Sequence, residues 1–146
     1  MIRKPLTIVL AEDDDGHATL VCRSLARAGV QNEVIRVADG QEAIDLLHGR
    51  GPVGGRPSLD ELLLLLDINM PRLNGLEVLR QLKADTATAS IPVIMLTTTD
   101  DPRDVEQCYR LGCCVYVVKP VIYADFVEAV RRLGLFTQIL TLPGTA

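Results

Sequence analysis

The chain has 146 residues, of which 48% are hydrophobic, and its 15 basic and 19 acidic residues give a formal net charge of −4. This length suits one domain with a substantial core, and the charge argues against binding of nucleic acid through its phosphates. The longest aliphatic run, 62–66, is far shorter than the roughly 20 residues of a membrane span, and acidic residues after the first apolar stretch argue against a secretory signal. We therefore expect a cytoplasmic protein without membrane or nucleic-acid partners.

The first third of the chain alternates between strand and helix periodicity. Residues 7–11 predict a strand that ends in acidic residues, and apolar positions within 18–25 then recur at helical spacing until Gly29. Residues 33–38 alternate polar and apolar side chains, which predicts a strand with one wetter face. Apolar positions within 43–47 indicate a short second helix.

The rest of the chain repeats this alternation. A loop at 49–57 holds four glycines and two prolines, and residues 62–66 predict a strand that is apolar on both faces, as in the centre of a parallel sheet. The elements expected after it are helices at 76–82, between Asp101 and Gly112, and at 124–133, with strands at 92–97 and 115–118.

Cysteines and histidines are scattered without the spacing of a zinc site. They are Cys22, Cys108, Cys113, Cys114, His17 and His48. In a reducing cytoplasm we expect the cysteines to be small buried apolar residues, and we expect both histidines at the surface.

Five strand–helix alternations predict a doubly wound α/β fold, in which helices cover both faces of a five-stranded parallel sheet in a single domain. Functional sites of such sheets lie at the carboxyl ends of the strands. The polar residues expected there are Glu12, Asp13, Asp67, Thr97 and Lys119. The second strand ends at Asp39, at a sheet edge where we expect no chemistry.

These side chains suit phosphoryl transfer. Glu12, Asp13 and Asp67 would repel one another unless a hard divalent cation such as Mg²⁺ lay between them. Lys119 and the Thr97 hydroxyl can compensate the charge on phosphoryl oxygens. Asp67 is then the nucleophile, which forms an acyl phosphate.

Four short segments stand in order at the strand ends. They are VLAEDD at 9–14, LDINMP at 66–71 followed by Gly75, MLTT at 95–98 and YVVKP at 116–120. Together they resemble the CheY-like receiver domains of response regulators, over residues 5–134. The resemblance implies a flavodoxin-like (β/α)5 fold with strand order 2-1-3-4-5, and a phosphoacceptor signalling protein that catalyses only its own phosphorylation and dephosphorylation.

The resemblance also implies individual roles at the phosphorylation site. Asp67 resembles the phosphoacceptor, and Lys119 resembles the phosphate-binding lysine. Asp13 resembles a direct Mg²⁺ ligand, Glu12 a ligand acting mainly through water, and Asn69 a ligand through its backbone carbonyl.

Further roles concern the response to phosphorylation. Thr97 and Tyr116 resemble the switch pair of the family. Asn69 and Thr99 occupy positions that tune the lifetime of the phosphoryl group in relatives. The Lys119–Pro120 peptide bond is often cis in the family.

The loop at 49–57 and the tail at 136–143 resemble those of stand-alone receivers paired with phytochrome-type histidine kinases. This implies a histidine kinase as phosphodonor, a histidine phosphotransfer protein as a further candidate partner, and a homodimer built on the C-terminal extension 135–146. Its apolar contacts would come from Phe136, Ile139, Leu140 and Leu142. We expect no output domain after residue 134, so signalling would use protein–protein contacts.

Other interpretations remain open. An aspartyl-phosphate hydrolase needs a second acid two residues after its nucleophile, where this chain has Asn69. A flavodoxin-like cofactor binder needs a Gly/Ser/Thr-rich phosphate loop, but acids occupy 12–15. A degenerate receiver would serve only as a scaffold. Among the acids, Asp14 and Asp15 are explained by a helix start alone.

Overall fold

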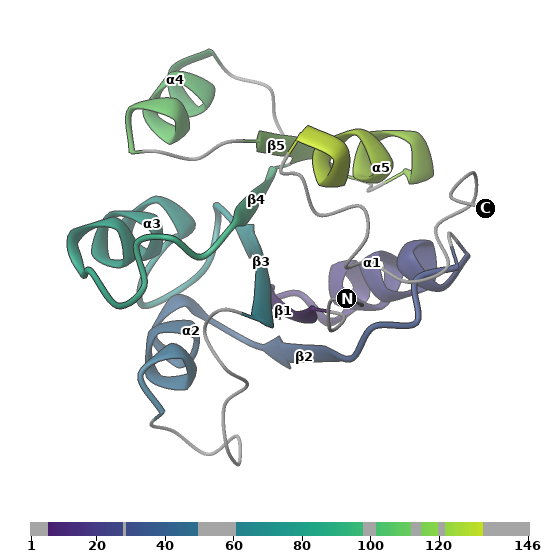
Figure 1. The fold of residues 1–146 in the computed structure, drawn as a ribbon, viewed down its shortest axis with the longest axis horizontal. Helices are drawn as coiled ribbons and strands as arrows, with labels where there is room; N and C mark the ends of the chain where they lie inside the picture. Colours follow the sequence, from purple (N-terminus) through teal and green to yellow (C-terminus); the bar gives the residue numbers. More distant parts are fainter. Residues whose placement is uncertain are drawn as a thin grey trace, which may run out of the picture.

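The five strands form one parallel sheet in the order β2-β1-β3-β4-β5, which confirms the predicted doubly wound fold (Figure 1). The computed structural model describes residues 6–27, 29–49, 61–97, 102–111, 115–119 and 122–132. The elements are β1 (Thr7–Ala11), α1 (Asp15–Arg27), β2 (Val34–Val37), α2 (Gly40–Leu47), β3 (Leu62–Asp67), α3 (Gly75–Ala84), β4 (Val93–Thr97), α4 (Pro102–Arg110), β5 (Val115–Val118) and α5 (Tyr123–Arg132).

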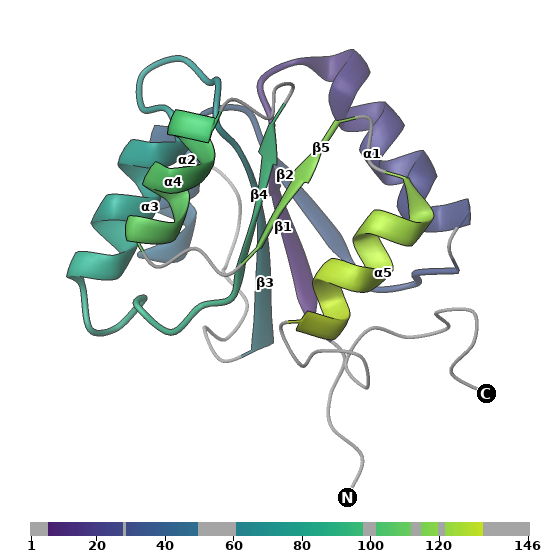
Figure 2. The ribbon, with the colours of Figure 1, turned by 90° about the horizontal axis from the view of Figure 1, so that it is seen from above.

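The helices cover the sheet from both sides. Helices α1 and α5 lie on one face, and α2, α3 and α4 lie on the other (Figure 2). In α1 the apolar residues Ala18, Val21 and Leu25 recur at helical spacing and are buried against the sheet. Within the described parts of the chain, no helix is long and apolar enough to cross a lipid bilayer.

Strand β3 is the centre of both cores. Its five leucines are all buried, and they alternate between the two faces because neighbouring side chains of a strand point in opposite directions. Leu63 and Leu65 pack in the cluster that includes α1 and α5, whereas Leu62, Leu64 and Leu66 pack in the cluster that includes α2 and α3. The continuous apolar run therefore predicted a buried central strand correctly.

Some predictions were wrong in detail or fall outside the described residues. Cys22 is exposed on α1, against our expectation of a buried thiol, because its place in the turn lies beside the apolar stripe rather than on it. Cys108 is buried as predicted. The loop at 50–60, Cys113 and Cys114, and the whole tail after residue 132, including Phe136, Ile139, Leu140 and Leu142, lie outside the described residues.

Candidate functional site

Strand register brings the polar strand ends together. Ala11 of β1 pairs with Leu66 of β3, so Glu12 follows β1 next to Asp67, the last residue of β3. On the other side Asp67 pairs with Leu96 of β4. Lys119 follows directly after β5, and its side chain reaches across the sheet end to Glu12 after β1 and to Asp67 of β3.

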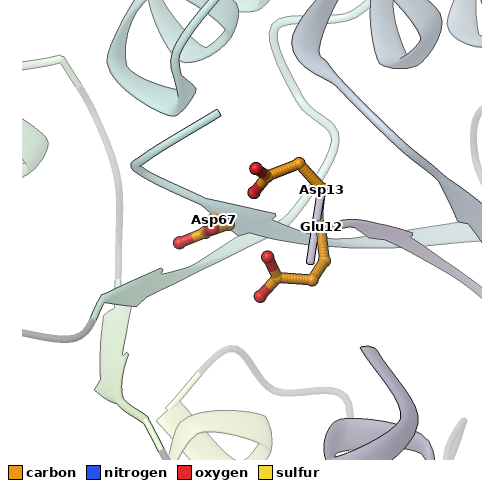
Figure 3. A group of neighbouring side chains, drawn as sticks. All are labelled: Glu12, Asp13 and Asp67. Atoms are coloured by element: carbon orange, nitrogen blue, oxygen red, sulfur yellow. The ribbon is translucent and has the colours of Figure 1, made fainter. Parts of the chain in front are cut away.

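Three carboxylates form an acidic cluster at this edge. One oxygen from each of Glu12, Asp13 and Asp67 lies within 4.8 Å of the others (Figure 3). Glu12 and Asp67 are buried, whereas Asp13 is exposed. The cluster opens into a cavity of about 210 Å³ that Asn69 and Lys119 also line. The structure thus brings together all the residues predicted to bind the cation or the phosphoryl group, except that the Thr97 side chain is outside the described part.

Lys119 is the cation of the site. Its Nζ lies 2.6 Å from Glu12 Oε1 and 3.4 Å from Asp67 Oδ1, and its side chain is only 6% exposed. The longer approach is an ion pair without the direction of a hydrogen bond. Asp67 Oδ1 is therefore a buried oxygen for which the described residues supply no hydrogen-bond donor.

The two buried carboxyls have opposite pKa shifts. Burial raises the pKa of Asp67 to about 6, and the neighbouring Glu12 adds to this, while Lys119 and the Asn69 backbone N–H oppose it. Burial also acts to raise the pKa of Glu12, but hydrogen bonds from Lys119 and from the Asp14 backbone N–H outweigh it, so the pKa of Glu12 is lowered. Glu12 is thus the carboxylate that Lys119 neutralises, and Asp67 is the one left in need of a cation.

These residues fit a hard divalent cation. Mg²⁺ prefers a few carboxylate oxygens and keeps several waters, and the cluster offers three such groups beside an open cavity. Asp67 Oδ1, which accepts no hydrogen bond from the described residues, is the oxygen that such an ion would satisfy.

Charged contacts hold the β1–α1 segment (12–14). Arg36 of β2 donates from Nε and Nη2 to the Glu12 carbonyl oxygen at 3.0 and 2.8 Å, and its Nη1 pairs with Asp15 at 2.6 Å. Asp14 caps α1 by accepting the His17 backbone N–H at 2.9 Å. Asp14 and Asp15 therefore have the helix-start roles expected of them, whereas nothing in the sequence pattern pointed to Arg36.

Backbone contacts hold the β3–α3 segment (68–74). The Gly75 N–H donates to the Ile68 carbonyl at 2.8 Å, and a Cβ at Gly75 would lie 2.2 Å from the Asp67 carbonyl oxygen. Asn74 and Glu77 form a capping box at the start of α3. Only glycine permits this approach, so the segment turns immediately beside Asp67.

The same segment is anchored to α2. Arg72 has a φ of 65° and forms a two-pronged ion pair with Asp39, at 3.1 Å from Nε and 3.2 Å from Nη2. Asp39 also caps α2 by accepting the Glu42 N–H at 2.8 Å. A Cβ at Gly40 would lie 2.1 Å from the Leu73 carbonyl oxygen. Asp39 therefore has a structural role at the edge where no chemistry was predicted.

The predicted switch residues are only partly described. Thr97 ends β4 opposite Val118, but its side chain, Thr99 and Pro120 lie outside the described residues. Tyr116 is half-buried on β5 and packs on the cluster that includes α2 and α3. Its ring lies edge-on to Tyr109 of α4, with 6.4 Å between ring centroids.

Sequence reasoning missed one residue of the site. We expected His17 at the surface, and 45% of its side chain is exposed, yet its Nδ1 lies 3.1 Å from Lys119 Nζ and it lines the cavity. The available signal was its place in the first turn of α1, immediately after the acidic residues that follow β1.

Comparison with known proteins gives the class first. The family description "Response regulator receiver domain" matches residues 8–131, so the chain belongs to this family. It is a receiver domain of two-component response regulators, which are signalling proteins rather than enzymes with a separate substrate.

Its relatives narrow the class. The solved structure of the bacteriophytochrome response regulator AtBRR is 36% identical, with a TM-score of 0.80 over 92% of this chain and 96% of that one. The bacteriophytochrome response regulator RtBRR is 41% identical, with a TM-score of 0.79 over 97% and 85% of the two chains. Response regulator Rcp1 of Synechocystis sp. is 32% identical over 95% of this chain and 94% of its own, and an Mn²⁺-bound form of Rcp1 has been solved. The chain is thus close to phytochrome response regulators.

Proposed function

We propose that this receiver works as a single-domain response regulator, which accepts a phosphoryl group on Asp67 from a histidine kinase with Mg²⁺ bound. The observation that carries the proposal is the buried Asp67 carboxyl at the end of β3, inside the acidic cluster and 3.4 Å from Lys119 Nζ. An oxygen to which no described residue donates a hydrogen bond, beside a lysine and two further acids, suits an acceptor of a charged group.

The proposed reaction is an in-line displacement. An Asp67 carboxylate oxygen attacks the phosphorus of a phosphohistidine, so an O–P bond forms while the P–N bond breaks; the imidazole nitrogen takes the electron pair of that bond and a proton from water. Lys119 compensates the charge of the phosphoryl oxygens, and Thr97, which ends the neighbouring strand, would donate its hydroxyl to one of them. When bound, Mg²⁺ withdraws charge from these oxygens; Glu12, Asp13, Asp67 and the Asn69 carbonyl would hold it.

Phosphorylation would then switch the surface. The added charge, close to −2, would draw Thr97 inward, and Tyr116 would follow, changing the arrangement of α4 and β5. Attack of water on phosphorus would return the carboxylate and release inorganic phosphate. Asn69 and Thr99 would set how fast this happens.

The partners are proposed from the relatives. Two solved neighbours bear the name bacteriophytochrome response regulator, which supports a phytochrome-type histidine kinase as the phosphodonor in the cytoplasm. A histidine phosphotransfer protein is a further candidate. Homodimerisation through 135–146 remains a prediction from the apolar residues of that extension.

Phosphotransfer profiling tests the proposal. Each histidine kinase of the same genome is labelled with radioactive ATP and mixed with the full chain in Mg²⁺. We expect rapid labelling by one or a few kinases, a phosphate bond with the base lability of an acyl phosphate, and no labelling of Asp67→Asn. Labelling that persists in Asp67→Asn would contradict the site assignment. A parent chain that no kinase and no acetyl phosphate labels would favour the scaffold, and turnover of phosphomonoesters would favour the hydrolase.

A further inference from the structure

His17 is the residue of the site cavity to which the acidic cluster and the proposed reaction give no role. It is the third residue of α1, and its backbone N–H donates to the Asp14 carboxylate, which fixes where its side chain leaves the helix. Its Nδ1 lies 3.1 Å from Lys119 Nζ, within hydrogen-bond distance. A residue that touches the phosphate-binding lysine can influence the reaction without touching phosphate.

The chemistry of this contact is determined by its partner. A lysine ammonium has three N–H donors and no acceptor, so a ring nitrogen that faces it must accept. The neutral His17 ring with its proton on Nε2 presents a lone pair on Nδ1. A protonated Nδ1 would instead point its N–H at the ammonium, and Glu12 Oε1 lies farther away, at 3.8 Å.

Among the described residues Lys119 therefore has three polar neighbours, of two kinds. Two are carboxylates, Glu12 at 2.6 Å and Asp67 at 3.4 Å, and the third is the imidazole at 3.1 Å. Both carboxylates would change their charge environment during the proposed reaction, since one is the phosphoacceptor and the other faces the bound cation. His17 is the neighbour that is neither the proposed phosphoacceptor nor a proposed cation ligand.

We propose that His17 is a positioning residue, which holds Lys119 Nζ beside Asp67 by accepting a hydrogen bond at Nδ1. The inference rests on the proposed phosphorylation of Asp67 and adds a determinant of its efficiency. Without an acceptor at this place, Glu12 would be the one hydrogen-bond partner left to Lys119 among the described residues, and the ammonium would spend less time where the phosphoryl oxygens arrive.

Two substitutions of His17 distinguish the loss of a hydrogen-bond acceptor from a change in side-chain volume. His17→Asn places an amide oxygen close to the position of Nδ1, whereas His17→Leu retains bulk without an acceptor. Beryllofluoride affinity and the rate of labelling by phosphoramidate are measured on the full chain in Mg²⁺. We expect His17→Leu to lower both about fivefold, the effect of one lost hydrogen bond, and His17→Asn to stay within about twofold of the parent. Leu20→Gln, at an exposed position of α1, is the control and should match the parent.

A double-mutant cycle shows whether His17 acts through Lys119. In a Lys119→Ala background, His17→Leu should have no further effect on beryllofluoride affinity. Equal affinities for the parent, His17→Leu and His17→Asn would overturn the proposal, as would additive losses in the cycle. A parent that binds no beryllofluoride and takes no label would overturn the proposed function together with this inference.

A metal-free measurement addresses the hydrogen bond itself. Long-range ¹H–¹⁵N NMR at alkaline pH should show Nδ1 of His17 as the unprotonated nitrogen, with a chemical shift that moves in Lys119→Ala. The His17→Asn spectrum assigns the signal against His48. A proton on Nδ1, or a shift indifferent to Lys119→Ala, would contradict the proposed contact.

Discussion

The two segments that flank Asp67 are held in place by different interactions. Segment β3–α3 is fixed by backbone proximity, since Gly75 approaches the Asp67 carbonyl too closely for any side chain. The β1–α1 segment is held by charged side chains. Arg36 donates a hydrogen bond to the Glu12 carbonyl oxygen, and Lys119 forms an ion pair with the Glu12 carboxylate. The β3–α3 segment beside the proposed nucleophile is therefore held by close packing. The β1–α1 segment, which bears two proposed cation ligands, is held by ion pairs that a bound cation would rearrange.

The same substitution at the start of the two helices that follow these segments should give the largest contrast. Gly75→Ala puts a Cβ at 2.2 Å from the Asp67 carbonyl oxygen and 2.8 Å from Ile68 Cα, and neither atom can move alone. We expect a loss of about 3 kcal/mol or more in the free energy of unfolding, measured with urea.

Gly16→Ala is the matched control in the other segment's helix. Its nearest contact would be Asp14 Oδ1 at 3.1 Å, the end of a side chain that can turn away. Alanine also favours the helix, so we expect a change within about 1 kcal/mol. Similar losses in both variants would contradict the distinction between packing and charge.

The raised pKa of the Asp67 carboxyl should be measurable in the pH dependence of the free energy of unfolding. Because its pKa is raised to about 6 from an ordinary 3.8, the folded chain binds the proton more tightly than the unfolded chain. The contribution of Asp67 to the free energy of unfolding should therefore fall as the pH rises from about 4 to about 6, and the penalty should persist above that range. Asp67→Asn lacks the penalty, so in EDTA it should be more stable than the parent at pH 8 by up to about 3 kcal/mol, with little difference near pH 4.

Magnesium sharpens this test. Because the ion binds the folded chain, it should raise the free energy of unfolding of the parent at pH 8. The difference in stability between the parent and Asp67→Asn should then become smaller. Urea unfolding at several pH values, with and without Mg²⁺, measures both effects. A stability difference that does not vary between pH 4 and pH 8 would contradict the raised pKa.

The smallest effect is expected at Arg72. Its ion pair with Asp39 involves a half-exposed side chain and is worth about 0.2–1 kcal/mol, while its left-handed backbone favours glycine. Arg72→Gly should change the free energy of unfolding by less than about 0.5 kcal/mol, and Arg72→Ala should lose more, since it keeps the strain without the pair. Urea curves compare the two, and a larger loss in the glycine variant than in the alanine variant would contradict the strain assigned to the Arg72 backbone.

Much of the fold was predictable because it depends on local patterns. The apolar run at 62–66 identified the central strand, and the spacing within 18–25 identified α1. Acids, a threonine and a lysine at the strand ends then located the site, since parallel strands end at one edge. Cys22 shows the limit, because one residue's place beside a helix stripe depends on how the helix rolls against the sheet.

The rest of the site depends on contacts between distant segments. Arg36 lies on β2, and the residues next to it in the sequence give no sign that its guanidinium donates to the Glu12 carbonyl oxygen. His17 and Lys119 are separated by most of the chain and meet only after β5 has joined the sheet. Arg72 has a positive φ without being glycine, which no propensity predicts.

The run of leucines in β3 leaves the pairing register of this strand weakly specified. Because Leu62–Leu66 present the same side chain on either face, a shift by one residue would exchange the two faces and still leave leucines at most of the buried positions. Asp67 breaks this equivalence, since the shift would carry its carboxylate to the other layer of the molecule, away from Lys119. Asp67, the proposed phosphoacceptor, would then also be the residue that makes β3 pair with its neighbours in the native register during folding.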